Sequence, residues 1–299
     1  MSKMRIGFIG AGLMGHGMAK HMLAAGHPLT VMANRNRHPI DDLIGRGAKE
    51  AKTPAEIAQA SDIVFLCLTD SRTVEAVVRG PQGIAKGARK GLIVVDCTTA
   101  DPVSTEALAK ELAEVGVTFC DSPLNGTPVQ ADEGKLSAMV GADAATFAAL
   151  RPVIATWAAK IEHLGPVGTG HKMKLLNNFI AQGYGALYAE ALVLGAKIGV
   201  TPDIIYRVMQ GSRMDCGYFQ TFFGYAHGGN RESHKFTISN ALKDLRYVEG
   251  LAHSAHMANP VGNAVKNSYS LAVAQGKGND FVPTVVDTIA HVNGVKPFH

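Results

Sequence analysis

The chain has 299 residues, of which 46% are hydrophobic and 18% are charged, and its formal net charge is +4. This is the composition of a globular protein with a sizeable core, without the Lys/Arg blocks typical of nucleic-acid binders. No apolar run reaches the roughly 18 residues of a membrane span. We therefore expect no nucleic-acid or membrane partner, and a small anionic ligand suits the charge best.

Four cysteines occur, at positions 67, 97, 120 and 216, and they form no C-x-x-C pair. Three lie in apolar, strand-like runs, where buried free thiols are ordinary in a reducing compartment. The N-terminus MSKMRIGFIGAG lacks the long apolar region of a signal peptide. We expect a cytoplasmic protein, and we predict no metal site.

Residues 1–166 alternate short apolar runs with amphipathic stretches. The predicted strands are MRIGFIG at 4–10, LTVMA at 29–33, DIVFLCL at 62–68, GLIVVDC at 91–97 and VTFCDSP at 117–123. The intervening segments read as helices, one of them with Asp101 as its N-cap and Pro102 at its first position. Strands that are apolar throughout and alternate with helices indicate a parallel sheet covered on both faces. This is the α/β, doubly wound, Rossmann-type class.

The pattern changes after the glycines around 165–170, and only helical periodicity follows. The predicted helices are 171–199, 202–211, 237–255, 260–275 and 282–293. We therefore expect a Rossmann-type dinucleotide-binding domain over 1–166 and an all-helical substrate and dimerisation domain over 167–299. A long helix that starts near the boundary should join them.

The glycine pattern GAGLMG at 10–15 follows the first predicted strand and opens a predicted helix. In that context the first glycine permits a tight turn, the second lets a pyrophosphate approach, and the third allows close helix–strand packing. The N–H groups at the helix start bind the phosphates. We predict that Gly10, Ala11, Gly12, Leu13 and Met14 bind a dinucleotide; the alternative is a purely structural glycine turn.

The residues after the second predicted strand bear on the choice of cofactor. An NAD site usually has Asp or Glu there for the ribose 2′-hydroxyl, whereas this chain has Asn34 followed by Arg35, with Arg37 close by. A guanidinium can bind a 2′-phosphate in a bidentate fashion, and a carboxylate would repel it. NADP is therefore favoured. In the alternative, the arginines are solvated and Asn34 serves the hydroxyl of NAD.

Turn-forming residues cluster in DSPLNGTPVQADEGKLSAMVG at 121–141, just past the carboxyl end of a predicted strand. Ligands of open α/β sheets bind at such ends. Gly126 and Thr127 offer backbone N–H groups to a carboxylate, and the side chains of Asn125 and Thr127 add hydrogen bonds. A substrate site and a plain turn are both compatible with this pattern.

The stretch GTGHKMKLLNN at 168–178 places unusual polar residues on a helix. Lys174, Asn177 and Asn178 share one helical face, which Gln182 extends by one turn. Asparagine is a poor residue for an exposed helix interior, so the pair favours a buried, hydrogen-bonding role. A lysine near the positive end of the helix dipole releases its proton more readily, which suits proton transfer. Lys172 points elsewhere. The alternative is a solvated polar face.

The same helix carries apolar side chains outside this polar face. Met173, Leu176 and Ile180 form a separate apolar stripe, and Phe179, Leu187, Leu192 and Leu194 add further apolar surface. We expect this surface to contact a second copy of the chain. The predicted assembly is a homodimer or a homotetramer.

These motifs, in this order, resemble those of the β-hydroxyacid dehydrogenase family over nearly the whole chain. That family includes 3-hydroxyisobutyrate dehydrogenases, tartronate semialdehyde reductases and glyoxylate/succinic semialdehyde reductases. GFIGAGLMGHGMAKHM is similar to its N-terminal signature, and the stretch at 168–178 fits its G-x-G-x-x-x-K-x-x-N-N motif. The resemblance implies that Lys174 is catalytic and that Asn178 binds substrate.

Three further segments carry the resemblance. CLTD at 67–70 and DCTT at 96–99 are similar to family segments that contact the cofactor, which implies such contacts at Leu68, Thr69 and Thr99. The segment with Phe236, Lys243 and Asp244 matches the family's F…KDL element. The resemblance implies that Lys243 contacts the cofactor and that Phe236 and Asp244 contact the substrate. From the pattern alone, Lys243 and Asp244 would be a surface charge pair.

The resemblance implies a reversible dehydrogenase that acts on a small 3-hydroxy acid or its semialdehyde. The residues after the second predicted strand favour NADP as its cofactor, with NAD possible. One departure concerns the substrate. Where the family usually has DAPVSGG, this chain has DSPLNGT, so Asn125 replaces the substrate-binding serine and Thr127 replaces the second glycine. A bulkier loop should change the acid accepted. The rival readings are an imine reductase and a non-catalytic NADP-binding assembly module, and both usually lack the lysine.

Overall fold

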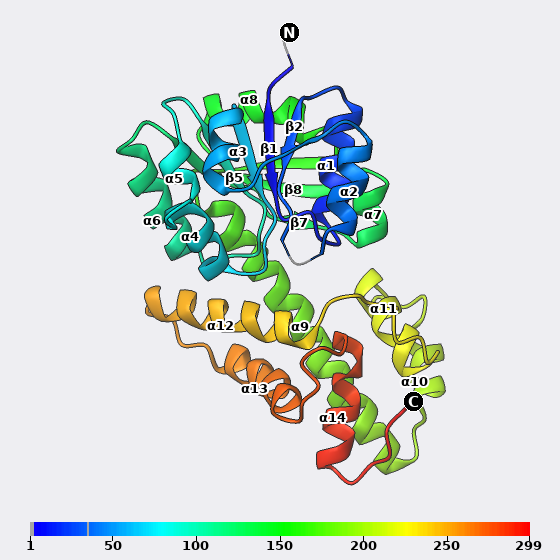
Figure 1. Ribbon diagram of the computed structural model, residues 1–299. Helices are drawn as coiled ribbons and strands as arrows, with labels where there is room; N and C mark the ends of the chain where they lie inside the picture. Colours follow the sequence, from blue (N-terminus) through cyan, green and yellow to red (C-terminus); the bar gives the residue numbers. More distant parts are fainter. Residues whose placement is uncertain (1–2, 35) are drawn as a thin grey trace. The chain divides into compact units, whose positions relative to one another are not determined.

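The computed structural model describes residues 3–34 and 36–299 (Figure 1). Its contacts divide the chain into two compact units, one that ends at Lys174 and one from Leu175 to His299. We call them the sheet unit and the helical unit. This grouping assigns the first turns of the long helix to the sheet unit, and the boundary predicted at residue 166 stays a prediction.

Nine strands of the described residues form one sheet, in the order β3-β2-β1-β4-β5-β6-β8-β7, with β9 paired to β8. They are β1 (Ile6–Ile9), β2 (Leu29–Val31), β3 (Lys49–Glu50), β4 (Ile63–Leu66), β5 (Ile93–Asp96), β6 (Thr118–Asp121), β7 (Leu124–Asn125), β8 (Leu136–Gly141) and β9 (Ala158–Gly165). From β3 to β6 all pairs are parallel. The strand order reverses between β1 and β4, and ligands of such sheets bind outside the carboxyl ends at that point.

Helices cover both faces of this sheet (Figure 1). They are α1 (Gly15–Ala24), α2 (His38–Gly45), α3 (Pro54–Ala60), α4 (Ser71–Arg79), α5 (Ile84–Gly87), α6 (Pro102–Ala113), α7 (Pro128–Asp132) and α8 (Ala144–Ile154). One core holds Met18, Met22 and Trp157, and the other holds Ile57 and Leu108. Two covered faces explain why the central strands are apolar throughout. The doubly wound class is confirmed, and Asp101 caps α6 as predicted.

Beyond β6 the sheet departs from the predicted all-parallel pattern. β8 is antiparallel to both β6 and β7, and β9 is parallel to β8. The turn formers between residues 121 and 141 hide the two-residue strand β7 in the sequence. In β9, charged residues such as Lys160 and Glu162 are exposed, so this strand has no apolar run to reveal it.

The first and third glycines of the GAGLMG turn are required by the fold. Gly10 has φ +103°, and a Cβ there would lie 2.2 Å from the Cys67 carbonyl oxygen. A Cβ on Gly15 would lie 2.1 Å from the carbonyl oxygen of Gly10. At Gly12, by contrast, no described atom lies within 4 Å of the Cβ position. The middle glycine therefore leaves room in front of the backbone, as a phosphate-binding turn requires.

The second unit is helical, as predicted. It contains α9 (Thr169–Ile198) from Leu175 onward, α10 (Pro202–Met209), α11 (Gly217–Ala226), α12 (Ile238–Ser254), α13 (Pro260–Ala274), a 3₁₀ turn η1 (Val282–Thr284) and α14 (Val285–Val292). Its core gathers aromatic side chains, among them Tyr188, Phe219, Phe223 and Tyr269. α12 packs against α13 (Figure 1). Helix α11 was not predicted, because its sequence GYFQTFFGYA is apolar and aromatic on nearly all sides.

None of the described helices is long and apolar enough to cross a membrane.

Gly17 supplies a test of the packing between α1 and α7. A Cβ at this position would lie 2.4 Å from the carbonyl oxygen of Ala131, a backbone atom that cannot rotate away. We expect Gly17→Ala to lower the free energy of unfolding by about 1–3 kcal/mol, as overpacking does. Gly45→Ala is the control, because no described atom lies within 4 Å of its Cβ position. Urea denaturation of both variants checks this; equal stability would contradict the close approach.

Candidate functional site

The start of α1 is built to bind an anion. Its N-cap residue, Met14, makes no side-chain hydrogen bond to the first turn within the described part of the chain, whereas Thr53, Asp70 and Asp101 cap their helices. Uncapped N–H groups at the positive end of a helix dipole bind phosphate well. Ala11 is buried and Leu13 is exposed. The structure thus places the five predicted residues of 10–14 in one turn at the carboxyl end of β1.

The segments after β4 and β5 lie along the same edge of the sheet. The N–H of Leu68 donates to Thr98 Oγ1 at 3.0 Å, and the N–H of Thr98 donates to Asp96 Oδ1 at 2.9 Å. These bonds hold the two segments together. Because β1, β4 and β5 are adjacent parallel strands, the predicted cofactor residues Leu68, Thr69 and Thr99 belong to the same edge as the glycine turn.

The residues beyond β2 are only partly as expected. Asn34 is exposed just after the strand, and Arg35 lies outside the described residues. The guanidinium of Arg37 binds both carboxylate oxygens of Glu50, at 2.9 and 3.1 Å, and also binds Asp41. Glu50 and then Asp41 raise the pKa of Arg37 above its ordinary value. Arg37 is therefore held by carboxylates of the protein itself.

Lys174 and Asn125, two predicted site residues far apart in the sequence, meet in the sheet unit. Lys174 Nζ donates to Asn125 Oδ1 at 2.8 Å, and both side chains are half-buried. Asn125 is positioned by strand β7, which pairs with Ser137 of β8. Gly126 follows with φ +139°, a conformation that favours glycine. The hairpin therefore presents the Asn125 amide to the first turns of α9.

Thr127 has a structural partner of its own. Its hydroxyl accepts from the N–H of Gln130, and its own N–H donates to Gln130 Oε1 at 2.9 Å. This capping box begins α7. The backbone N–H predicted to bind an acid group is thus bonded to a side chain at an exposed helix end.

Asp121 joins the sheet to the start of α9. Its two carboxylate oxygens accept the N–H groups of Gly168 and His171, both at 2.6 Å. Burial raises the pKa of Asp121, while His171 and these two N–H groups act in the opposite direction. A Cβ on Gly170 would lie 2.7 Å from an Asp121 oxygen, so the glycine is needed for this approach. Sequence reasoning missed this carboxylate, although DSP at a strand end and GTG at a helix start were its signals.

The helical unit assembles the other predicted residues. Asn178 Nδ2 donates to Asp244 Oδ2 at 2.6 Å, and Lys243 Nζ lies 3.1 Å from Asp244 Oδ1. Asn177 Nδ2 donates to Asn178 Oδ1 at 3.2 Å. The Asp244 side chain is only 1% exposed, so Lys243 and Asp244 are not a surface charge pair. Phe236, just before α12, packs against the core of this unit.

Part of α9 reverses the usual polarity of a helix, because amide side chains are buried while apolar ones are exposed. Asn178 and Gln182 are 7% and 2% exposed, whereas Met173, Leu176 and Ile180 are 41–55% exposed. The buried, hydrogen-bonding role predicted for the asparagine face therefore holds for Asn178.

Comparison with known proteins agrees with both units. Residues 5–165 match the NAD binding domain of 6-phosphogluconate dehydrogenase, and residues 168–286 match the family described as NAD-binding of NADP-dependent 3-hydroxyisobutyrate dehydrogenase. The mitochondrial 3-hydroxyisobutyrate dehydrogenase of Mus musculus is 30% identical over 92% of this chain and 84% of that protein. The chain belongs to the β-hydroxyacid dehydrogenase family. It is an NAD(P)-dependent oxidoreductase that acts on hydroxyl or aldehyde groups.

Other similar proteins carry names that point to other ligands. The 3-sulfolactaldehyde reductase of Escherichia coli K12 is 29% identical over 95% of each chain. A solved structure titled Psf3 in complex with NADP+ and 2-OPP is 26% identical, with a TM-score of 0.80 over 96% of this chain and 99% of that one. Solved imine reductases also match, but at 18–22% identity they share the fold alone.

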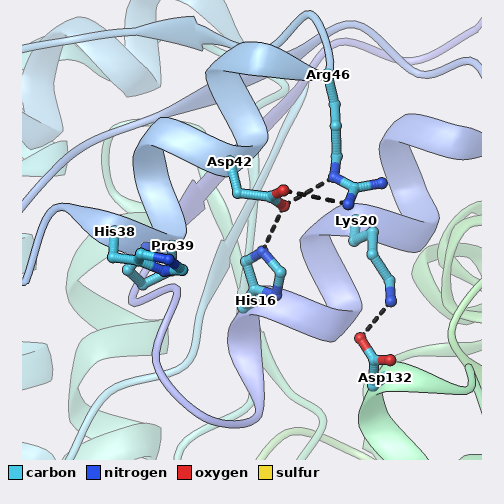
Figure 2. A pocket seen from close by; sticks show the side chains of 7 residues that line it. All are labelled: His16, Lys20, His38, Pro39, Asp42, Arg46 and Asp132. Atoms are coloured by element: carbon cyan, nitrogen blue, oxygen red, sulfur yellow. Dashed lines mark hydrogen bonds and ion pairs between the residues drawn. The ribbon is translucent and has the colours of Figure 1, made fainter.

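A hollow on the dehydrogenase's sheet unit lies between α1, α2 and α7 (Figure 2). Its volume is about 370 Å³, and its lining residues are His16, Lys20, His38, Pro39, Asp42, Arg46 and Asp132. Asp42 binds Arg46 at 2.7 Å and His16 at 2.8 Å, and these partners, Arg46 first, lower its pKa to about 2. Lys20 pairs with Asp132. No predicted site residue lines this hollow, and its ion pairs link the three helices.

His234, close to Phe236, should make the stability of the helical unit depend on pH. Its Nδ1 lies 3.2 Å from Thr221 Oγ1, and burial lowers the pKa of His234 to about 4. An unfolded histidine titrates near 6.5, so between pH 6.5 and 4 the unfolded chain binds more protons. Stability should therefore fall as the pH drops through this window, by up to about 3 kcal/mol.

Urea denaturation at pH 7.5 and 5 measures this loss in the wild type and in His234→Gln, which should lose less. His253→Gln, at an exposed position of α12, is the control. An equal loss in wild type and His234→Gln would rule out His234 as its source.

Proposed function

We propose that this dehydrogenase interconverts a small 3-hydroxy acid and its semialdehyde, with NADP as the preferred cofactor and Lys174 as the residue that moves the proton. The hydrogen bond of 2.8 Å between Lys174 and Asn125 carries the proposal. Of the two lysines in GTGHKMKLLNN, Lys174 is the one that shares a helical face with the asparagines. The bond joins this lysine to the loop predicted to hold the acid group of the substrate.

The sheet unit fits a dinucleotide. The glycine turn at 10–14 offers N–H groups beside the open position of Gly12, and no side chain of the described residues caps α1. We assign cofactor contacts to Leu68, Thr69 and Thr99 on the neighbouring loops, and to Lys243 in the helical unit. When bound, the nicotinamide ring supplies or accepts the hydride.

The preference for NADP depends on the end of β2. An amide at position 34 does not repel a 2′-phosphate, as a carboxylate there would. Because Glu50 binds the guanidinium of Arg37, we assign the phosphate to Arg35 and Asn34. Arg37 takes no part in this assignment.

The proton step follows from the groups around Lys174. Its ammonium donates a proton to the oxygen that forms during reduction, and its amine accepts the hydroxyl proton during oxidation. Asn125 Oδ1 accepts from Nζ and so directs the lysine side chain. We assign orientation of the reacting oxygen to Asn178, which Asn177 and Asp244 hold by both ends of its amide.

The acid group of the substrate is assigned to Asn125, Gly126 and Thr127, with Phe236 and Asp244 as further substrate contacts. An amide whose oxygen accepts from a lysine can present its N–H₂ group to a carboxylate. To reach the Thr127 N–H, the acid group must replace Gln130 Oε1. Lys174 argues against both an imine reductase and a non-catalytic assembly module.

We also propose that the protein forms a homodimer or homotetramer, and that it resides in the cytoplasm, where its four free cysteines stay reduced. Large apolar side chains of the helical unit are exposed: Leu187, Leu194, Ile198 and Val208 are 60–73% exposed. An apolar surface of this kind fits a second copy. Leu192, expected in the same surface, is fully buried in the core, and Phe179 packs against that core.

Replacing Lys174 tests the mechanism. Lys174→Met should lower kcat for a semialdehyde substrate by about 10²–10⁴-fold, the usual contribution of acid–base catalysis. Binding of NADPH, followed by fluorescence titration, should change little. Lys172→Ala is the matched control, because this lysine pairs with Glu106 on a different side of the helix. Near-wild-type turnover of Lys174→Met on the best substrate of a panel would refute the proposal.

Replacing Asn34 tests the cofactor assignment. Asn34→Asp places a carboxylate where a 2′-phosphate is expected, so the ratio of kcat/KM for NADP to that for NAD should fall roughly tenfold or more through charge repulsion. The measurement is initial rates with each cofactor on a panel of hydroxy acids and semialdehydes. If the ratio does not change, the ribose phosphate does not bind at the end of β2.

A further inference from the structure

A buried polar cluster lies at the carboxyl ends of β5 and β6, within the sheet unit. Its members are Asp96, Thr105, Asp121 and His171, each exposed by no more than 1%. They come from β5, α6, β6 and the first turn of α9. None of them was predicted as a site residue, and the proposed proton step does not use them.

Each carboxylate of this cluster organises one segment that the proposed function needs. Asp121 holds the N–H groups of Gly168 and His171, and so fixes the first turn of the helix that leads to Lys174. Asp96 Oδ1 holds the N–H of Thr98 at 2.9 Å, at the turn that leads to Thr99. The two carboxylates thus serve the proton-transfer side and the cofactor side.

His171 lies between these two carboxylates, and its Nδ1 lies 2.7 Å from Thr105 Oγ1. The Asp101 carbonyl, 3.1 Å from the same hydroxyl, already accepts the backbone N–H of Thr105. The Thr105 hydroxyl can therefore donate to Nδ1. In a neutral ring with Nδ1 as the acceptor, Nε2 carries the proton.

His171 Nε2 faces Asp96 Oδ2 at 4.0 Å. Neither atom has a hydrogen-bond partner among the protein groups that the structure describes. Two buried acceptors that faced each other would be unfavourable, because each has lost its hydration. The tautomer with the proton on Nε2 instead points an N–H donor at the carboxylate, which is a favourable contact.

We propose that His171 is a positioning residue of the dehydrogenase. Its Nε2 edge holds Asp96, and with it the cofactor-binding turn after β5, while its Nδ1 and backbone N–H hold the start of α9. One buried ring thereby links the cofactor-binding edge to the helix segment that ends at Lys174. The role in catalysis rests on the proposed function, but the effect on cofactor binding does not.

Two amide substitutions distinguish the role of Nδ1 from that of Nε2. His171→Asn places its amide near the position of Nδ1, so it keeps a hydrogen-bond partner for Thr105 and leaves Asp96 Oδ2 without a donor. His171→Gln reaches the position of Nε2 and offers a donor to Asp96. We expect His171→Asn to raise the Kd of NADPH about tenfold, in line with one unsatisfied buried carboxylate oxygen. His171→Gln should stay within about threefold of the wild type.

NADPH fluorescence titration gives the Kd of each variant, and circular dichroism gives its Tm. If His171→Asn does not fold, Asp96→Asn breaks the same contact from the other side: its amide oxygen can still accept the N–H of Thr98, but an N–H₂ group then faces His171 Nε2. This variant should raise the Kd for NADPH to a similar degree.

An unchanged Kd in His171→Asn, or in Asp96→Asn where that variant replaces it, overturns the proposal. An equal loss of affinity in His171→Asn and His171→Gln does so as well, because the Nε2 edge would then have no special role. The proposed function fails by a different result, full turnover in Lys174→Met, which leaves these affinities untouched.

Discussion

The carboxylate of Asp121 is the constraint on which the candidate site depends. It ends β6 and accepts two N–H groups at the start of α9, so the sheet sets where that helix begins and which way its first turns face. Lys174 follows His171 by three residues, and Asn125 follows Asp121 by four. A negative charge at a helix N-terminus is also favourable by itself. The buried Asp121 carboxylate therefore positions both partners of the hydrogen bond between Lys174 and Asn125.

Much of the sheet unit could be predicted, because its physics is local. Strands buried on both faces must be apolar along their whole length, and the Asp101–Pro102 pair marks the start of a helix without reference to the rest of the chain. The strands β7 and β9 could not be predicted. One is two residues long and lies among turn formers, and the other exposes its charged side chains. Their place is decided by pairing with β8, which is a contact between distant segments.

The candidate site shows the same division. Spacing alone selects Lys174 over Lys172, and the poor helix propensity of asparagine correctly indicates that Asn178 is buried. Spacing does not reveal that Asp244 binds Asn178, or that His171 and Asp96 face each other, because 66 and 75 residues separate these partners in the sequence. Arg37 shows the converse. Its position after β2 suits a phosphate, yet the pairing of β2 with β3 brings Glu50 to it.

Chemical rescue of Lys174→Ala tests the central claim most directly. The account predicts that small primary amines restore semialdehyde reduction in this variant, since an added ammonium can donate the proton that Lys174 no longer supplies. The rescued rate should rise with amine concentration and depend on the pKa of the added amine, while the wild type shows no such gain. Turnover of Lys174→Ala that stays at the wild-type level without added amine would contradict the account.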